Sequence, residues 1–208
     1  MPVLQPTEYD ASYFEGASQS LTHNAGYSDY SRVQYNSRST RFVASLEESS
    51  GTVFGDMAIG LNVNGRFIGK KMLVVGCAYG YLVQKLRDLG VDAWGIDVSP
   101  FAIGQADPAV APYLEVADAR VKMQTYRRNE WDFVLSRWFL SCMSDTDLPS
   151  LITEMNRVTK NQIHIVNPIV NPLFYNQKTL LEWADLPFAV GTILIPNDDF
   201  NGYFTVIN

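Results

Sequence analysis

Short apolar runs alternate with helical patterns along most of the chain from residue 71 onward. The run 72–75 ends at a glycine, and apolar residues then recur at helical spacing as far as Gly90, which suits a left-handed helix end. Further apolar runs that predict strands follow at 93–96, 113–116, 132–135 and 162–166. Helical patterns are found at 99–105, 147–158 and 179–184. Strands that alternate with helices predict an α/β fold with a doubly wound, mostly parallel sheet.

The C-terminal part of the chain departs from this alternation. Two apolar runs, 188–195 and 203–207, are separated by the short polar turn 197–199. Consecutive strands joined by so short a link pair in an antiparallel manner. We therefore expect a C-terminal antiparallel hairpin that completes a seven-stranded sheet.

The N-terminal part departs in another way. Residues 1–30 are polar and rich in aromatic side chains without a dominant period, and weak helical patterns follow at 31–46 and 53–61. Disordered segments are usually poor in aromatic residues, so this segment is expected to pack against the rest of the protein. We expect residues 1–64 to form a helical and irregular arm over the active site, and residues 65–208 to form the sheet domain of one compact unit.

Composition limits the class of protein. The chain has 208 residues, of which 47% are hydrophobic, and a formal net charge of −6, which argues against a broad basic face for nucleic acid. No apolar stretch has the length of a membrane span, and the N-terminus lacks the layout of a signal peptide. The two cysteines, Cys77 and Cys142, show no metal-ligand spacing. We therefore expect a cytoplasmic protein without a metal site or a disulfide framework.

The glycine turn after the first strand is the strongest candidate for a ligand site. Gly76-Cys77-Ala78-Tyr79-Gly80 joins a strand to a helix, and Asp97 ends the next strand. In an open α/β sheet both features lie at the carboxyl edge of the strands, where ligands bind, and an acid there can hold a ribose. The turn lacks the third glycine of nicotinamide-binding loops, and it lacks the lysine and hydroxyl residue of nucleoside-triphosphate loops.

Four motifs in register resemble the class I S-adenosylmethionine-dependent methyltransferases. The stretch 72–80 resembles the first motif of this family, V-L-D-x-G-C-G-x-G. The stretch 95–99 is similar to its G-x-D-x-S, 117–119 to its acidic turn after the third strand, and 131–136 to its F-D-x-V-x-S. This resemblance covers about residues 65–208, and it implies a Rossmann-like fold and S-adenosylmethionine as cofactor.

The resemblance also implies roles for single residues. The turn formed by Gly76, Cys77, Ala78 and Gly80 would run past the methionine half of the cofactor. Asp97 would accept both ribose hydroxyl protons, because an ionised carboxylate offers two acceptor oxygens. The adenine ring would be held by Asp118 at its amino group, by the backbone N–H of Ala119, and by Val98 and Phe101 at its face. Ser136 and Arg137 would line the edge nearest the methyl group.

Two positions differ from the family pattern. Val74 stands where the family commonly has an acid, and Ala78 stands where it commonly has a second glycine. These two differences leave open a non-catalytic interpretation, in which a methyltransferase-like domain serves as a binding or scaffold subunit.

No residue is marked by the sequence as a certain catalytic base. Methyl transfer is an in-line displacement, so alignment and desolvation carry most of the catalysis. Candidate catalytic residues are His23, Tyr27 and Arg137, whereas His164 is expected to be a core residue of the fifth strand. Aromatic residues of the arm could close over the sulfonium cation: Tyr13, Tyr27 and Tyr30.

The leading hypothesis for the function is methyl transfer from S-adenosylmethionine to a small-molecule acceptor bound beneath the N-terminal arm. The alternatives are a nucleic-acid methyltransferase, which would need a partner to supply a basic surface, and the non-catalytic subunit. Neither the acceptor nor the oligomeric state follows from the sequence.

Overall fold

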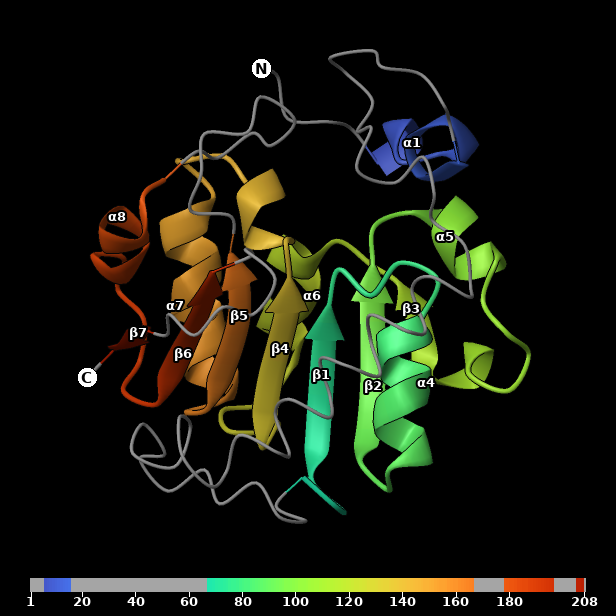
Figure 1. The fold of residues 1–208 in the computed structure, drawn as a ribbon, viewed down its shortest axis with the longest axis horizontal. Helices are drawn as coiled ribbons and strands as arrows, with labels where there is room; N and C mark the ends of the chain where they lie inside the picture. Colours follow the sequence, from blue (N-terminus) through green and yellow to red (C-terminus); the bar gives the residue numbers. More distant parts are fainter. Residues whose placement is uncertain (1–5, 16–66, 167–177, 197–204, 208) are drawn as a thin grey trace.

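The computed structural model describes residues 6–15, 67–166, 178–196 and 205–207 (Figure 1). Within these residues one sheet has the strand order β3-β2-β1-β4-β5-β6-β7. Its strands are β1 (Lys71–Val75), β2 (Asp92–Asp97), β3 (Leu114–Val116), β4 (Phe133–Arg137), β5 (Gln162–Val166), β6 (Thr192–Pro196) and β7 (Thr205–Ile207). The first six strands run parallel, and β7 pairs with β6 in the antiparallel direction. The predicted α/β fold and terminal antiparallel pair are therefore confirmed.

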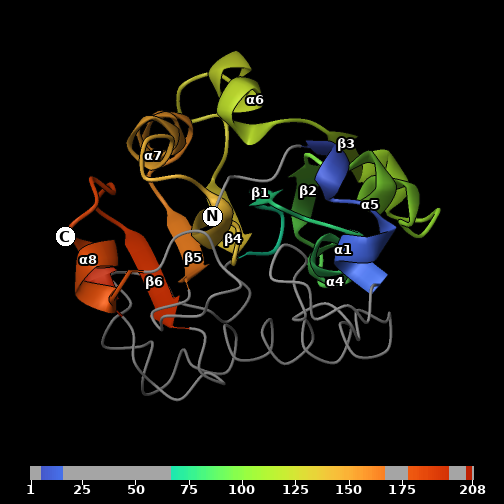
Figure 2. The ribbon, with the colours of Figure 1, turned by 90° about the horizontal axis from the view of Figure 1, so that it is seen from above.

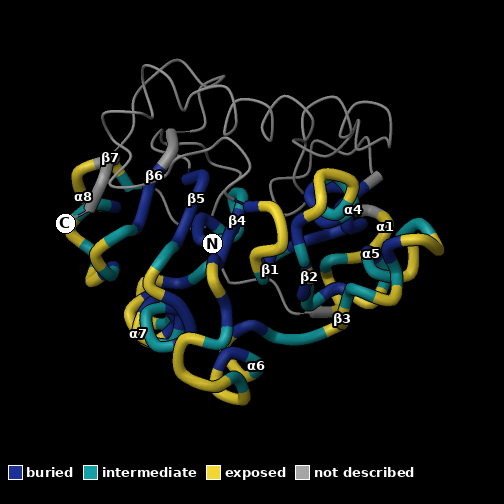
Figure 3. The backbone as a smooth tube through the Cα atoms, turned by 90° about the horizontal axis from the view of Figure 1, so that it is seen from below, coloured by how far each residue is buried: buried dark blue, intermediate teal, exposed yellow. Residues whose placement is uncertain are grey.

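The helices cover both faces of the sheet. They are α1 (Ala11–Glu15), α4 (Tyr81–Asp88), α5 (Pro100–Gly104), α6 (Ala119–Thr125), α7 (Leu148–Val158) and α8 (Leu180–Ala184), and short 3-10 turns occupy Pro6–Glu8, Ala111–Tyr113 and Leu140–Cys142. Seen from above, α6 and α7 lie on one face of the sheet and α4 on the other (Figure 2). The strands between them are mostly buried, as Figure 3 shows.

Alternation along β1 divides the core into two layers. Met72 and Val74 belong to the cluster that contains the buried residues of α4. Leu73 and Val75 belong to the cluster that contains the buried face of α7. Successive strand residues point to opposite faces of a sheet, so a strand covered by helices on both sides reads as a continuous apolar run. Val74, which replaces the acid of the family pattern, is thus a core residue with 2% exposure.

The helices predicted at 99–105 and 179–184 both begin with side-chain capping hydrogen bonds. Ser99 precedes α5, its side chain accepts a hydrogen bond from the Ala102 backbone N–H, and Pro100 is the first helical residue. Thr179 and Glu182 form a reciprocal capping box at the start of α8. By contrast, the sequence did not predict α6, because only Ala119 and Met123 of that helix are buried and so leave little apolar periodicity.

The N-terminal arm is described only for residues 6–15. There Tyr13 and Phe14 pack in a cluster with Ala78, Tyr79, Tyr81 and Ala102. The helices predicted at 31–46 and 53–61 and the turn at 197–199 lie outside the described residues, so the division at residue 64 stays a prediction. Among the described residues, no helix is both long enough and apolar enough to cross a membrane.

Candidate functional site

A pocket opens at the carboxyl edge of the sheet, where the strand order reverses. β1 is flanked by β2 on one side and by β4 on the other, so the chain leaves these neighbouring strands in diverging directions. Residues at or after the carboxyl ends of β1, β2, β3 and β4 line the pocket, together with aromatic residues of the N-terminal segment that holds α1. The pocket encloses about 800 Å³, including the open space at its mouth.

The glycine turn after β1 forms the floor of the pocket. Gly76 has a φ of 72° and Gly80 a φ of 77°, the left-handed region that favours glycine. A Cβ on Gly76 would lie 2.9 Å from the Cβ of Phe139, so this position is closed to side chains on steric grounds as well. Ala78 has a φ of 49° and therefore holds a left-handed conformation despite its side chain. Gly76 and Ala78 both line the pocket.

Asp97 joins the glycine turn to the end of β2. Its Oδ2 accepts the backbone N–H of Ala78 at 2.8 Å, and its Oδ1 accepts that of Ser99 at 2.9 Å. An ionised carboxylate has about four acceptor positions, so these two bonds leave acceptor capacity for a ligand. Burial raises the pKa of Asp97, and the backbone hydrogen bonds oppose this rise. Val98 lies beside it in the pocket wall.

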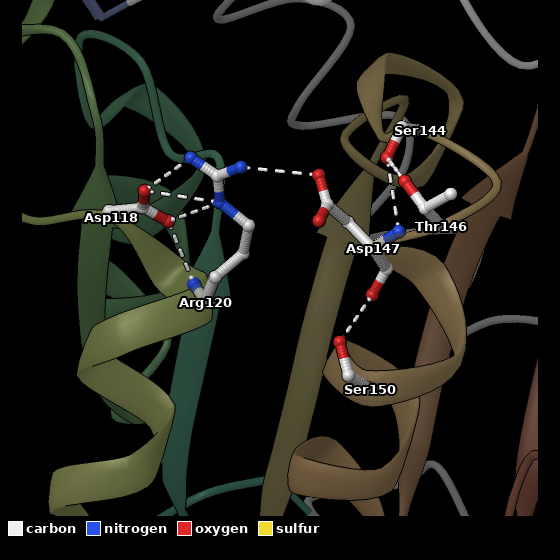
Figure 4. Close-up of polar contacts among 6 residues, drawn as sticks. All are labelled: Asp118, Arg120, Ser144, Thr146, Asp147 and Ser150. Atoms are coloured by element: carbon white, nitrogen blue, oxygen red, sulfur yellow. Dashed lines mark hydrogen bonds and ion pairs between the residues drawn. The ribbon is translucent and has the colours of Figure 1, made fainter.

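Asp118 lies after β3 and is paired with Arg120. Asp118 is the N-cap of α6, and its side chain accepts the backbone N–H of Arg120 at 2.9 Å. The Arg120 guanidinium binds the same carboxylate, with Nη2 2.6 Å from Oδ2, and reaches Asp147 at 3.2 Å (Figure 4). Hydrogen bonds from the Arg120 side chain are the main cause of a lowered pKa at Asp118. Asp118, Ala119 and Arg120 all line the pocket.

Ser136 does not line the pocket, in contrast to the sequence-based expectation. It is fully buried in β4, and its hydroxyl lies 2.8 Å from Nδ1 of His164. His164 Nε2 in turn lies 3.0 Å from Oε1 of Gln162. Burial lowers the pKa of His164 to about 3, so the ring is neutral. His164 is therefore a core histidine, as predicted, and Ser136 faces it because side chains of β4 alternate between the two faces.

The residues after β4 turn sharply into the pocket. Trp138 has a φ of 60°, and its backbone N–H donates to the Ile165 carbonyl at 2.9 Å. The guanidinium carbon of Arg137 lies 4.3 Å from the centroid of a Trp138 ring. Arg137, Trp138, Phe139 and Met143 contribute to the pocket wall. Of these four residues the sequence motifs indicated only Arg137, although an aromatic pair directly after an apolar strand was a usable signal.

Aromatic residues of the N-terminal segment cover one side of the pocket. Tyr9, Tyr13 and Phe14 line it. The Ser99 hydroxyl donates a hydrogen bond to the Tyr9 carbonyl, which ties this segment to the turn after β2. The Phe14 and Tyr79 rings lie 5.3 Å apart, centroid to centroid. Part of the arm therefore packs at the site.

Cys142 is the thiol in the pocket wall. Burial is the largest cause of a rise in its pKa to about 12. The protonated thiol is a weak nucleophile and a weak base at neutral pH. Cys142 is therefore a packing residue of the site.

The structure brings most of the predicted cofactor residues together. The pocket wall includes these residues named from the sequence: Gly76, Ala78, Asp97, Val98, Asp118, Ala119 and Arg137. Cys77 is buried with its Sγ toward Gly95, and Gly80 begins α4 behind the turn. The candidates His23 and Tyr27, as well as Tyr30, lie outside the described residues.

Comparison with known proteins agrees with this architecture. Residues 72–162 match the family model described as a methyltransferase domain. Magnesium protoporphyrin IX methyltransferase from Synechocystis PCC 6803 with bound S-adenosylmethionine is 17% identical, with a TM-score of 0.52 over 82% of this chain and 73% of that one. An S-adenosylmethionine-dependent methyltransferase from Archaeoglobus fulgidus is 16% identical, with a TM-score of 0.46 over 63% of this chain. The chain spans about half of that second protein, 49% of its length.

At 17% identity the Synechocystis structure shows the fold alone, whereas the family model identifies residues 72–162 as similar to a methyltransferase domain. No curated protein sequence matches the chain. The resemblance drawn from the four sequence motifs is thus confirmed by the match over residues 72–162. Residues 72–162 therefore match a methyltransferase domain, and they lie within a Rossmann-like sheet.

Proposed function

We propose that this protein transfers a methyl group from S-adenosylmethionine to a small-molecule acceptor, and that the pocket at the carboxyl edge of the sheet holds both. The observation that carries the proposal is the position of Asp97. Its carboxylate is held by Ala78 and Ser99 in the wall of the pocket, directly beside the glycine turn. A carboxylate in this position can accept hydrogen bonds from both hydroxyls of a ribose, and a glycine turn lets a cofactor approach the backbone closely.

The residues of the pocket fit the cofactor in shape and in chemistry. Gly76 and Ala78 keep their backbone in left-handed conformations, and the small side chains at this floor leave room for the methionine end. Asp97 keeps acceptor capacity for the ribose hydroxyls. Val98 supplies an apolar contact for the adenine face, and Ala119 supplies a backbone N–H for the ring edge.

The cofactor supplies an electrophilic methyl group on a sulfonium centre. The chain contributes orientation and exclusion of water, because Tyr9, Tyr13, Phe14 and Trp138 line the space around the floor of the pocket. Aromatic faces attract cations, so these rings also favour a positively charged ligand. Alignment in such a desolvated site supplies the catalysis that an in-line displacement requires.

An apolar, small acceptor fits the remainder of the pocket. The wall beyond the glycine turn is formed by Phe14, Trp138, Phe139 and Met143, with Arg137 as the charged group nearest to them in sequence. The net charge of −6 disfavours a nucleic-acid acceptor, because such partners are bound through phosphate contacts to a basic surface. We therefore infer that the acceptor is a small molecule with apolar surface.

Calorimetric titration with S-adenosylhomocysteine, the demethylated product, tests the proposal. Asp97→Ala should weaken binding by about 1–3 kcal/mol, because a charged hydrogen bond to the ribose is lost. Asp92→Ala is a matched control, since Asp92 begins the same strand at the end remote from the pocket. It should bind as the wild type does. Absence of binding at millimolar ligand would end the proposal, and an unchanged affinity of Asp97→Ala would remove Asp97 from the site.

A further inference from the structure

The Asp118 carboxylate accepts hydrogen bonds from three N–H groups of a single residue, and one of these groups, Nε, is shared between both oxygens. Its Oδ1 accepts the Arg120 backbone N–H at 2.9 Å and Nε at 3.0 Å. Its Oδ2 accepts Nε at 3.1 Å and Nη2 at 2.6 Å. A carboxylate has about four acceptor positions in all. Within the described residues, Arg120 therefore occupies the acceptor capacity that an adenine amino group would need.

Arg120 also has a second anionic partner. Its Nη1 lies 3.2 Å from Oδ2 of Asp147, so the guanidinium stands between two carboxylates (Figure 4). The position of Asp147 is fixed by its backbone, because its N–H donates to the Ser144 hydroxyl at 3.0 Å and its carbonyl accepts from Ser150 at 2.9 Å. A guanidinium released from Asp118 thus has an anchored carboxylate within reach.

We propose that Arg120 is a gate on the adenine end of the pocket. In this gate the guanidinium leaves Asp118 when the adenine amino group binds there, and it remains paired with Asp147. The inference rests on the proposed function, because it requires an adenine-bearing cofactor at Asp118. Arg120 acts here as a positioning residue that sets cofactor affinity through its competition for Asp118.

Because the Arg120–Asp118 ion pair is partly exposed, separating it costs little free energy. The side chain of Arg120 is 42% exposed and that of Asp118 is 29% exposed, so water screens their attraction. When a ligand binds only the open state, its apparent affinity is its affinity for that state multiplied by the fraction of molecules that are open. We expect the closed gate to weaken cofactor binding about two- to tenfold.

Titration of S-adenosylhomocysteine into the wild type and four variants tests the gate. Arg120→Ala should bind about two- to tenfold more tightly than the wild type, because Asp118 is then open. Asp147→Asn should bind more weakly, because a guanidinium released from Asp118 then loses the carboxylate with which it stays paired, and this effect should vanish in the double variant Arg120→Ala/Asp147→Asn. Arg128→Ala removes the same charge from an exposed position outside the pocket and should match the wild type.

Ionic strength provides a second readout. Salt screens exposed ion pairs, so the affinity of the wild type should rise with salt while that of Arg120→Ala stays constant. Weaker binding by Arg120→Ala, or equal binding by all five proteins at every salt concentration, would overturn the gate and leave the proposed function intact. No binding by any of them would contradict the proposed function and the gate with it. Melting curves of each variant verify that it is folded.

Discussion

Asp97 is half-buried in the pocket wall and His164 is fully buried in the core, and their surroundings decide which of them can carry a charge. Asp97 receives backbone N–H groups from Ala78 and Ser99, which oppose the rise of its pKa on burial. His164 meets Ser136 and Gln162, which are neutral. Gln162 donates its amide to Asn156 at 2.7 Å, so its carbonyl oxygen faces His164, whose proton is then on Nε2. Asp97 is thus equipped to bind a ligand, and His164 is a neutral core group.

The buried neutral His164 should make stability depend on pH. Its pKa falls from 6.5 in the unfolded chain to about 3 in the folded protein, so between these values the unfolded state binds a proton that the folded state excludes. Stability is therefore retained above pH 6.5 and lost as pH falls below it, by up to about 1.4 kcal/mol per pH unit. Urea unfolding of the wild type and of His164→Gln at pH 7, 6 and 5 measures this loss of stability. The other titrating groups contribute equally to both proteins and cancel in the difference. Equal pH slopes for the two proteins would show that His164 is not the cause.

At the scale of elements, the turn between β1 and α4 concentrates the backbone constraints of the site. Gly76 combines a left-handed φ of 72° with the close approach of Phe139. Ala78 tolerates a φ of 49° at a cost of about 1–2 kcal/mol that glycine would not have. The turn is thus less tolerant of a side chain at its first position than at its third.

Two substitutions in opposite directions test this difference. Gly76→Ala should destabilise the protein by about 2–4 kcal/mol, from left-handed strain and the contact with Phe139. Ala78→Gly should change stability by less than about 1 kcal/mol, because relief of strain is offset by the flexibility of glycine when unfolded. Gly104→Ala is the control, since Gly104 lies in α5 with open space around it and should gain up to about 1 kcal/mol. Chemical denaturation measures all three, and a loss at Gly76 no larger than the change at Gly104 would contradict the argument.

The elements differ in how far the sequence reveals them. The parallel strands β1, β2, β4 and β5 contain apolar runs bounded by turns, and the structure places their ends within two residues of the prediction. The amphipathic α7 carries an equally clear signal. The sequence of α6 carries little helical signal, because most of its residues are half-buried or exposed. Local pattern therefore predicts an element to the extent that the element is buried.

At the scale of the whole molecule, the site depends on contacts that no local pattern contains. The glycine turn, Asp97 and Asp118 were predictable because each follows a strand whose carboxyl end meets the same edge. The bond from Ser99 to the Tyr9 carbonyl joins residues 90 positions apart. The contribution of Trp138 and Phe139 depends on a left-handed turn at a residue that is not glycine. The sequence thus predicted the cofactor side of the pocket far better than its aromatic wall.

The measurement that tests the central claim most directly is a crystal structure of the protein with S-adenosylhomocysteine. The account predicts that the ribose hydroxyls donate to the Asp97 carboxylate, with the adenine ring beside Val98 and Ala119. The homocysteine end should lie along the backbone at Gly76. A ligand bound elsewhere on the molecule, or one whose ribose in this pocket has no contact with Asp97, would contradict the account.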